Sequence, residues 1–441
     1  MVHLPRTAVI GAGSSGMVAL KALVEKGIPV ICFEKGDRVG GNWVFQNSNG
    51  LSSSYRSLHI NTSRERMEYT DFPMPKSYPD FPHHTHIAEY FASYADHFDL
   101  LRHIRFSTAV ERAERRDGGG WRLTLDDGSV EEFDALVVAN GHHWDPRRPE
   151  PAFPGSESFP GVQLHAHDFE DNTAWRDLSV LVVGMGNSAM DIAVESSWVA
   201  HRTYLAARTP VHIVPKYVFG RPMDQVETPA LARMLPWKVR QRLTAGMLKA
   251  VVGRYERYGL RTPTHGMLQA HITVSDTILT RLAHGAVVAK PNLSRFEGSE
   301  AVFEDGTRAH VDVVVYATGY RITFPFFDEE LVSAKDNRIS LYSRVFHPDM
   351  TDLAFIGLVQ PLGAIMPIAE EQGRLVADHL AGTYALPSRQ EMQDAIDRQD
   401  AEVRARYIGS KRHTIQVDFD LYLHALRSER RRGAKRAGVL V

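Results

Sequence analysis

The chain has 441 residues but only one cysteine, Cys32, and no excess of either charge. A single cysteine excludes an internal disulfide and every redox mechanism that needs a cysteine pair. The formal net charge of −2 gives no reason to expect a nucleic-acid partner. We read the basic stretch near the C-terminus, RSERRRGAKRAGVLV, as a frayed, solvated tail.

Long hydrophobic runs are also missing. The longest uncharged stretch, Leu353 to Ala369, has 17 residues and is interrupted by Gln360, Pro361 and Pro367. It is too short and too broken for a membrane-spanning helix, and we expect a strand, a turn and the start of a helix there. The N-terminus leads straight into an apolar strand, so we expect no signal peptide, no membrane anchor and a cytoplasmic location.

The first glycine-rich fingerprint is GAGSSG, Gly11 to Gly16, directly after the apolar strand AVI. Such glycines permit a tight turn and let the backbone approach a pyrophosphate at a helix N-terminus. The next strand, PVICFEK, ends in Glu34, whose carboxylate would accept hydrogen bonds from ribose hydroxyls and repel a 2′-phosphate. This unit therefore predicts an unphosphorylated dinucleotide such as FAD.

The second fingerprint is GMGNSA, Gly184 to Ala189, after the strand VLVV. Its following strand, TYLAART, ends in Arg208, whose positive charge would attract a 2′-phosphate, although Arg202 nearby could serve instead. This unit predicts NADPH. Small residues also mark ordinary strand–helix packing, so either fingerprint alone is a weak signal, and the pair in strand–turn–helix context is a strong one. Two dinucleotides in one chain imply electron transfer between them.

Two further buried strands, FDALVVANG and DVVVYATGY, each end in a glycine turn, and a proline-rich connector follows the first. The chain therefore leaves one domain, builds another and returns. We predict an α/β protein with two Rossmann-like dinucleotide-binding domains, the smaller inserted in the larger. The FAD domain is expected at residues 1–165 plus 325–441 and the NADPH domain at 166–324. A helix is expected over Ile87 to Phe98, and mostly helix and loop between Pro210 and His271.

Several strings together resemble one family, the flavin-containing monooxygenases. FPGVQLHAHDF resembles the family fingerprint, with Phe159, Gly161, His165 and Phe169 in its positions. FEKGDRVGGNW is similar to a segment that closes over the flavin, and Asn61 with Thr62 to the Asn-Thr pair beside the flavin ring. VVVYATGY and FIGLVQPLGAIMPIAEEQGRLVADHL match later family segments, so the resemblance runs from residue 7 to about residue 388.

The resemblance implies a flavin monooxygenase dependent on NADPH and O₂. It implies that a flavin C4a-(hydro)peroxide passes one oxygen to a soft nucleophile, in amine N-oxidation or sulfide S-oxidation. Asn61 would be the catalytic residue, because its amide can donate and accept hydrogen bonds without titrating. From the residues alone, a residue that caps or turns a loop is the favoured interpretation of Asn61, and the resemblance reverses it. The expected partners are O₂ and a small nucleophilic substrate, and a homodimer stays open.

Two departures from the family pattern bear on function. Microsomal members carry a hydrophobic C-terminal anchor, whereas this chain ends in a charged tail. The related Baeyer–Villiger branch has a Trp-Pro extension after the fingerprint histidine, and Phe169 and Glu170 stand in those places here. The alternatives are Baeyer–Villiger oxygenation of ketones, an uncoupled NADPH oxidase that produces H₂O₂, and a flavin-binding sensor without turnover.

The expected ligands of the two cofactors follow from the fingerprints and the resemblance. No metal is expected, because the histidine pairs lie in proline-rich loops without cysteine. The helix after Gly363 is expected to direct its N-terminus at the flavin. For FAD the predicted residues are Gly11, Ala12, Gly13, Ser14, Ser15, Gly16, Glu34, Lys35, Gly41, Asn42, Trp43, Asn61, Thr62 and Gln360. For NADPH they are Gly184, Gly186, Asn187, Ser188, Ala189, Asp191, Arg208 and Thr209.

Overall fold

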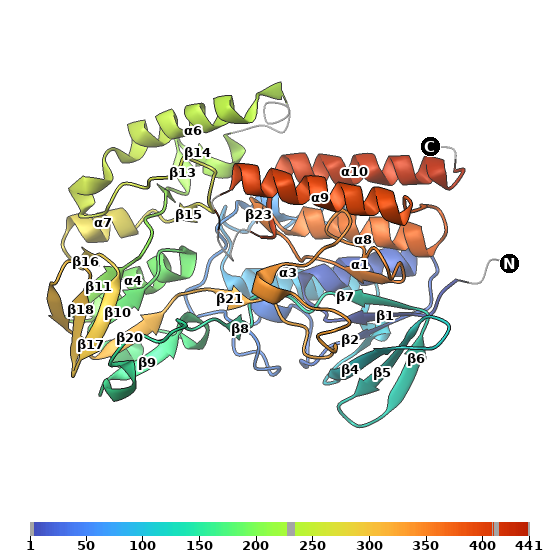
Figure 1. Cartoon of the computed structure of the whole chain (residues 1–441), viewed down its shortest axis with the longest axis horizontal. Coiled ribbons are helices and arrows are strands. Elements are labelled where there is room, and N and C mark those ends of the chain that lie inside the picture. Colours follow the sequence, from blue (N-terminus) through green and yellow to red (C-terminus); the bar gives the residue numbers. More distant parts are fainter. Residues whose placement is uncertain (1–3, 227–233, 408, 410–413, 440–441) are drawn as a thin grey trace. The chain divides into compact units, whose positions relative to one another are not determined.

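The computed structural model describes residues 4–226, 234–407, 409 and 414–439. The chain divides into two compact units (Figure 1). Unit 1 consists of Met1–Ser52, Thr62–Asp145 and Arg321–Val441, and unit 2 of Ser53–Asn61 and Pro146–Tyr320. The chain passes between the units near two short strands, β8 (Asp145–Pro146) and β21 (Tyr320–Arg321).

Unit 1 is built on a five-stranded parallel sheet of order β22-β7-β1-β2-β3. Its strands are short and buried, and helix α1 connects β1 to β2, as a doubly wound sheet requires. The strands are β1 (Thr7–Ile10), β2 (Val30–Phe33), β3 (Ile104–Arg105), β7 (Ala135–Val138) and β22 (Leu353–Phe355). The helices are α1 (Ser14–Glu25), α2 (Arg64–Met67), α3 (His84–His97), α8 (Met366–Leu380), α9 (Arg389–Arg406) and α10 (Phe419–Arg436).

Two smaller sheets complete unit 1. An antiparallel sheet crosses between β3 and β7 along the chain, and a pair of short parallel strands joins the segment before α8 to the segment before α10. They consist of β4 (Val110–Arg115), β5 (Trp121–Leu125), β6 (Val130–Phe133), β23 (Gln360–Leu362) and β24 (Gln416–Asp418).

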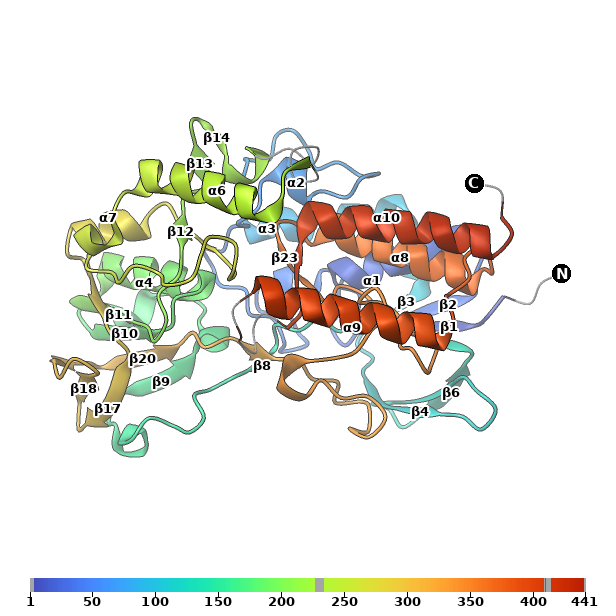
Figure 2. The ribbon, with the colours of Figure 1, turned by 45° about the horizontal axis from the view of Figure 1, so that its top comes forward.

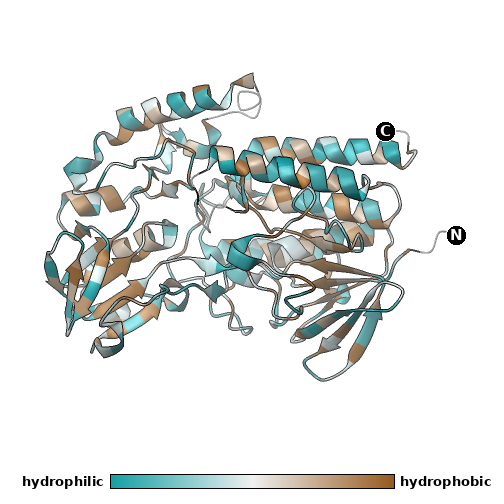
Figure 3. Cartoon of the chain, viewed as in Figure 1, coloured by the Kyte–Doolittle hydropathy of each residue, from teal (hydrophilic) through white to brown (hydrophobic). Residues whose placement is uncertain are grey.

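Unit 2 repeats the same plan with a parallel sheet of order β16-β11-β10-β20-β9. Figure 3 shows the strands of both central sheets as hydrophobic, in agreement with strands buried on both faces. The sheet consists of β9 (Val162–His165), β10 (Ser179–Val183), β11 (Arg202–Ala206), β16 (Val287–Lys290) and β20 (Val313–Tyr316). Around it lie α4 (Asn187–Val199), α6 (Trp237–Val252), α7 (Ile278–Ala283), β12 (Ile213–Val214), β13 (Tyr217–Val218), β14 (Arg221–Pro222), β15 (Thr273–Val274), β17 (Leu293–Glu297), β18 (Glu300–Phe303) and β19 (Arg308–His310).

The predicted fold class, α/β with two Rossmann-like units, is confirmed. The boundaries of the compact units differ from the boundaries predicted for the domains. Unit 2 begins at Pro146 and not at residue 166, because β9 pairs with β20 in the sheet of unit 2. It also includes the short segment Ser53–Asn61. Which unit holds which dinucleotide stays a prediction.

The predicted frayed tail is wrong for the described residues, since Phe419–Arg436 forms helix α10. Leu426 is buried on one face of α10, which packs beside α8 (Figure 2). The basic residues of this stretch find acidic partners within unit 1: Arg436 pairs with the buried Glu429 at 2.5 Å, and Arg430 with Asp378 at 2.5 Å. Local composition suggested a solvated tail because it shows none of these partners.

Two other predictions for local structure have mixed outcomes. Helix α3 and the strand–turn–helix reading of residues 353–369 are confirmed, the latter by β22, β23 and the start of α8. The described part of residues 210–271 contains helix α6 but also three two-residue strands, β12, β13 and β14, which are too short to leave a periodic pattern. Residues 227–233 of this stretch lie outside the described residues.

His165 ends β9 and is fully buried in unit 2. Its Nδ1 accepts a hydrogen bond from His167 N–H at 3.0 Å, and Asp168 accepts one from the backbone of His165. Because Nδ1 is an acceptor, the imidazole is neutral with its proton on Nε2. Burial lowers the pKa of His165 from 6.5 to about 4.

This histidine should make the free energy of unfolding depend on pH. The unfolded chain binds a proton at His165 near pH 6.5, whereas the folded chain does so only near pH 4, so stability is lost as pH falls through that window. Between pH 7 and pH 5 the loss is expected to be about 2 kcal/mol. His165→Asn keeps an acceptor in the place of Nδ1 and does not titrate.

Denaturant unfolding at pH 7 and pH 5 checks this expectation. The free energy of unfolding should fall less in His165→Asn than in the unmodified chain, by about the same 2 kcal/mol. Equal losses in both proteins would show that His165 is already protonated, or accessible, in the folded state.

Candidate functional site

The first glycine turn joins β1 to α1 in unit 1. Gly13 caps α1 and has no side chain, so the backbone N–H groups of the first turn face outward from the helix end. A Cβ on Gly16 would lie 1.7 Å from the carbonyl oxygen of Gly11, which is why no other residue fits there. The turn therefore presents a backbone surface that suits an anion.

Glu34 lies beside this turn and is only 4% exposed. One carboxylate oxygen accepts a hydrogen bond from Ala12 N–H at 2.7 Å, and the other accepts one from Gly36 N–H at 2.7 Å. The residue is thus a buried carboxylate attached to the fingerprint, and not a solvated strand end. The oxygen bonded to Gly36 also accepts a hydrogen bond from the Asn49 side chain at 3.4 Å, and the oxygen bonded to Ala12 keeps a further lone pair for a ribose hydroxyl.

The loop around Gly41 also reaches the glycine turn. Gly40 N–H donates to Ala12 O at 3.1 Å, and a Cβ on Gly41 would lie 3.1 Å from the Cα of Gly13. A side chain at Gly13 or Gly41 would fill the space between the two loops. Asn42 and Trp43 follow in a short 3₁₀ turn and are half-buried, and Lys35 is exposed.

The C-terminal part of unit 1 meets the same turn through Gly357. A Cβ at Gly357 would lie 2.1 Å from Ser15 Oγ, so the loop after β22 passes directly over the first turn of α1. Gln372 on α8 accepts a hydrogen bond from Gly357 N–H at 2.8 Å and fixes this loop. Gln360, in β23, is half-buried and pairs through its backbone with Ile415.

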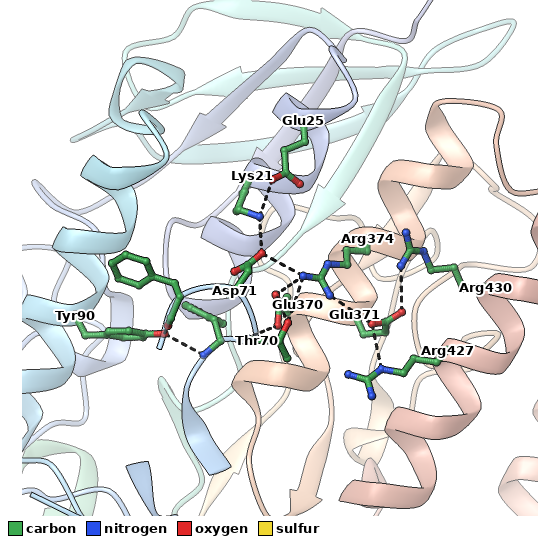
Figure 4. Close-up of polar contacts among 12 residues, drawn as sticks. Lys21, Glu25, Thr70, Asp71, Tyr90, Glu370, Glu371, Arg374, Arg427 and Arg430 are labelled. Atoms are coloured by element: carbon green, nitrogen blue, oxygen red, sulfur yellow. Dashed lines mark hydrogen bonds and ion pairs between the residues drawn. The ribbon is translucent and has the colours of Figure 1, made fainter. Parts of the chain in front are cut away.

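The chain after Thr62, itself buried, is attached to both helices of this region (Figure 4). Thr70 donates to Glu370 on α8 through its backbone N–H, at 2.9 Å, and its hydroxyl, at 2.8 Å. Asp71 lies between Lys21 of α1, at 2.7 Å, and Arg374 of α8, at 3.1 Å. Burial raises the pKa of Glu370, while the bonds from Lys21 and Arg374 lower the pKa of Asp71 against the opposing effect of burial.

Tyr69 in the same loop donates its hydroxyl hydrogen to Ser14 O at 2.7 Å. The loop that follows the predicted Asn-Thr pair is therefore fixed to the first residue of the predicted FAD-binding helix. Sequence reasoning missed Tyr69, Glu370 and Asp71, because no local pattern distinguishes these partners from ordinary loop and helix residues.

The second glycine turn joins β10 to α4 in unit 2. Gly184 has φ +139°, and a Cβ there would lie 2.4 Å from Ala317 O in the turn after β20. Gly186 caps α4, and Ser188 lies half-buried in its first turn, before the buried Ala189. Asn187 uses its side-chain oxygen to accept a hydrogen bond from Val274 N–H at 2.9 Å. The assignment of this glycine turn to NADPH stays a prediction.

Arg208 and Thr209 follow the carboxyl end of β11 and are exposed. Ala206 pairs with Val183, the last residue before the glycine turn, so Arg208 lies at the edge of the sheet where the turn lies. Arg202 pairs with Ser179 at the opposite edge, away from the glycine turn, and the assignment of Arg208 to the 2′-phosphate stays a prediction. Burial and the nearby charge of Arg208 lower the pKa of Arg147.

Asn61 ends the segment 53–61 of unit 2 and is half-buried. The residue before it, Ile60, is bonded to the rest of unit 2, because its carbonyl oxygen accepts a hydrogen bond from Lys216 Nζ at 3.4 Å. Among the described residues, no hydrogen bond partner is found for the Asn61 amide. Its donor and acceptor are thus available to a ligand.

Both turns fit the dinucleotides expected from the sequence. Unit 1 offers a helix N-terminus, a glycine-lined gap and a buried carboxylate that repels phosphate, while unit 2 offers a helix N-terminus and an exposed arginine. Within the described ranges, no three His, Cys, Asp or Glu side chains are grouped to hold a metal ion. None of the described helices is long and apolar enough to span a bilayer.

A family model described as flavin-binding monooxygenase-like matches residues 5–435. Flavin-containing monooxygenase 5 of Homo sapiens is 39% identical over 431 residues, which cover 94% of this chain and 80% of the human protein.

Solved structures show the same fold. An S-allyl-L-cysteine S-oxygenase from Allium sativum superposes with a TM-score of 0.73 at 25% identity, covering 98% of this chain and 92% of the other. A cyclohexanone monooxygenase from Rhodococcus, bound to NADP⁺, superposes with a TM-score of 0.71 at 18% identity, covering 98% of each chain.

The position of Arg208 generates a prediction about nucleotide preference. Arg208→Ala should weaken the binding of NADPH about 10- to 100-fold and leave the binding of NADH nearly unchanged, because only NADPH has the 2′-phosphate. Arg202→Ala, at the far edge of the same sheet, is the matched control and should change neither. Steady-state KM for both nucleotides measures this, and equal use of NADPH and NADH by the unmodified protein would overturn the assignment.

The two backbone bonds of Glu34 generate a second prediction. Glu34→Gln replaces one acceptor oxygen by an NH₂ group that faces a backbone N–H, which costs about 1–3 kcal/mol. The purified variant should retain much less FAD per chain, measured by absorbance after denaturation. Glu111→Gln, at an exposed position, should retain the normal amount. Full FAD content in Glu34→Gln would remove Glu34 from the predicted ligands.

Proposed function

The chain belongs to the flavin-binding monooxygenase-like family, and we propose that it oxygenates soft nucleophiles, at an amine nitrogen or a sulfide sulfur. Family membership makes it a flavoprotein monooxygenase that uses FAD and NADPH. FAD, when bound, supplies the redox chemistry by taking a hydride from NADPH and activating O₂. The residues of the chain bind, orient and shield the reactants.

In unit 1, the first turn of α1 would hold the pyrophosphate of FAD, and Glu34 its ribose. In unit 2, the first turn of α4 would hold the pyrophosphate of NADPH, and Arg208 its 2′-phosphate. The observation that carries this arrangement is the pair of strand ends: a buried carboxylate at Glu34 and an exposed guanidinium at Arg208. Two different dinucleotides are needed for electron transfer from one to the other.

Asn61 would act where oxygen is transferred. Its amide can donate one hydrogen bond and accept another, and its state does not change with pH. We propose that it holds the nicotinamide and the reacting oxygen in one geometry. No nucleophile–base pair is required for this chemistry, since the cofactor supplies the reactive group.

The preference for amines and sulfides over ketones rests on the end of the histidine fingerprint. Phe169 and Glu170 occupy the places where the Baeyer–Villiger branch has its Trp-Pro extension. Phe169 is buried against Trp175 and Tyr55, with ring centres 5.0 and 5.6 Å apart, and Glu170 O accepts a hydrogen bond from Arg56 N–H. The structural neighbour from Allium sativum is named an S-allyl-L-cysteine S-oxygenase, and this name supports the same substrate class.

The test is oxidation of NADPH in air across a panel of amines, sulfides and ketones, with H₂O₂ measured in parallel. We expect N-oxides or sulfoxides and less H₂O₂ than NADPH consumed. Esters or lactones from ketones would replace the proposal by Baeyer–Villiger oxygenation. Peroxide without any oxygenated product would show an NADPH oxidase.

Asn61→Ala should separate NADPH oxidation from oxygenation. The variant should still bind FAD and accept hydride, because the contacts at Gly11–Gly16 and Glu34 remain. The amount of product per NADPH should fall at least about tenfold, because one or two hydrogen bonds at the reacting oxygen are lost. The amount of H₂O₂ should rise by the same amount.

Asn61→Asp should be at least as damaging, because it places a negative charge where negative charge develops on the reduced cofactor. Stopped-flow absorbance and peroxide assays check both variants. If either one keeps the full ratio of product to NADPH, Asn61 is a loop residue without a role in oxygenation.

A further inference from the structure

The segment 53–61, which ends at Asn61, belongs to unit 2 although unit 1 residues flank it on both sides in the sequence. Its residues lie in no strand or helix, and it is attached to the rest of unit 2 by a backbone hydrogen bond from Arg56 N–H to Glu170 O at 2.8 Å and by side-chain contacts. The contacts that hold it therefore decide where the backbone of Asn61 lies.

Tyr55 is the buried anchor of this segment, with 4% of its surface exposed. Its ring packs on Phe169 within the core of unit 2, and its hydroxyl donates to Asp191 Oδ2 at 2.5 Å. Asp191 lies in the second turn of α4, just after the glycine fingerprint. The helix predicted to bind NADPH is thus bonded directly to the segment of Asn61.

Lys216 provides a second attachment at the residue before Asn61. Its Nζ donates to Ile60 O at 3.4 Å, and its own backbone N–H donates to Asp276 at 2.7 Å. Ile60 is buried, so its carbonyl oxygen cannot turn to bulk water if the lysine is removed.

The pKa values of Asp191 and Lys216 depend on the groups that hold the segment. The pKa of Asp191 is raised to about 6, because burial and the charge of Glu195 raise it more than the bond from Tyr55 and the charge of Lys216 lower it. Burial lowers the pKa of Lys216, and the charges of Asp191 and Asp276 raise it. Each of these two charges therefore favours the ionised form of the other, while burial opposes ionisation of both.

We propose that Tyr55, Asp191 and Lys216 form a clasp that positions Asn61 against the dinucleotide-binding fold of unit 2. The side chain of Asp191 serves this clasp and is not a direct ligand of NADPH. The consequence for catalysis rests on the function proposed for Asn61, whereas the clasp itself rests on the contacts above.

The experiment uses the full-length protein with FAD bound and compares three variants. Tyr55→Phe keeps the ring in the core and removes the bond to Asp191. Lys216→Met keeps the apolar stem and removes the bond to Ile60 O. Arg56→Gln, in the same segment, removes an ion pair with Asp171 in which the arginine is 64% exposed, and it serves as the matched control.

Amide hydrogen exchange of a peptide spanning residues 56–61 is the first measurement. Tyr55→Phe and Lys216→Met should exchange at least about tenfold faster than the unmodified protein, since each loses a hydrogen bond to a charged group. Arg56→Gln should match the unmodified protein. FAD content and the dissociation constant for NADP⁺ should stay within about twofold in all three variants.

The second measurement is H₂O₂ released per NADPH with the best substrate of the panel. Tyr55→Phe and Lys216→Met should release several-fold more H₂O₂, and Lys216→Arg should restore part of the lost product. In an Asn61→Ala background, Tyr55→Phe should add no further loss, because the residue that the clasp positions is already gone.

Unchanged exchange in both Tyr55→Phe and Lys216→Met would overturn the clasp. A loss of NADP⁺ binding at least as large as the loss of product would overturn it as well, because Asp191 would then act on the nucleotide. Faster exchange in an enzyme that oxygenates no substrate would leave the clasp standing and refute the proposed function instead.

Discussion

Parallel pairing of one central strand with two neighbours is the constraint on which both units depend. In unit 1, β1 lies between β2 and β7, and in unit 2, β10 lies between β11 and β20. Parallel strands end at the same edge, so whatever follows each strand meets at that edge. Glu34 thereby reaches Ala12 at 2.7 Å, and Gly184 lies so close to Ala317 that no side chain fits. The chemistry at each turn is a consequence of strand order.

The same constraint explains why the chain must return to unit 1 after unit 2. β7 and β22 are neighbours in the sheet of unit 1, with Leu136 beside Leu353, yet almost all of unit 2 lies between them in sequence. Strand order does not explain the second crossing, at residues 53–61, which contains no strand. Its place follows from a tyrosine–carboxylate bond, a lysine–carbonyl bond and a backbone bond from Arg56 N–H to Glu170 O. The segment that ends at Asn61 is therefore held by a few individual bonds, whereas the glycine turns are held by a cooperative sheet.

These two kinds of support decide what the sequence could predict. The fold class and both glycine turns follow from local periodicity, and the fold class is confirmed. The burial of Glu34 could not be predicted, because its bonds to backbone N–H groups leave no trace in composition. Tyr55 and Asp191 are 136 residues apart, and no local pattern links them. Helix α10 was mistaken for a solvated tail for the same reason, since the partners of Arg430 and Arg436 lie outside the local pattern that composition describes.

The buried carboxylates and the amide of Asn61 differ in how they bond to the protein. Glu34, Glu370 and Asp191 are largely withdrawn from water, and each accepts hydrogen bonds from groups of the protein itself. Glu34 and Glu370 hold backbone N–H groups in place and Asp191 holds a tyrosine hydroxyl, and the charge of Glu370 and Asp191 depends on pH because burial raises both pKa values, that of Asp191 to about 6. An amide has no such dependence, and that of Asn61 has no hydrogen bond partner among the described residues. A neutral amide therefore offers a ligand the same hydrogen bonds at every pH, which a carboxylate in its place would not do.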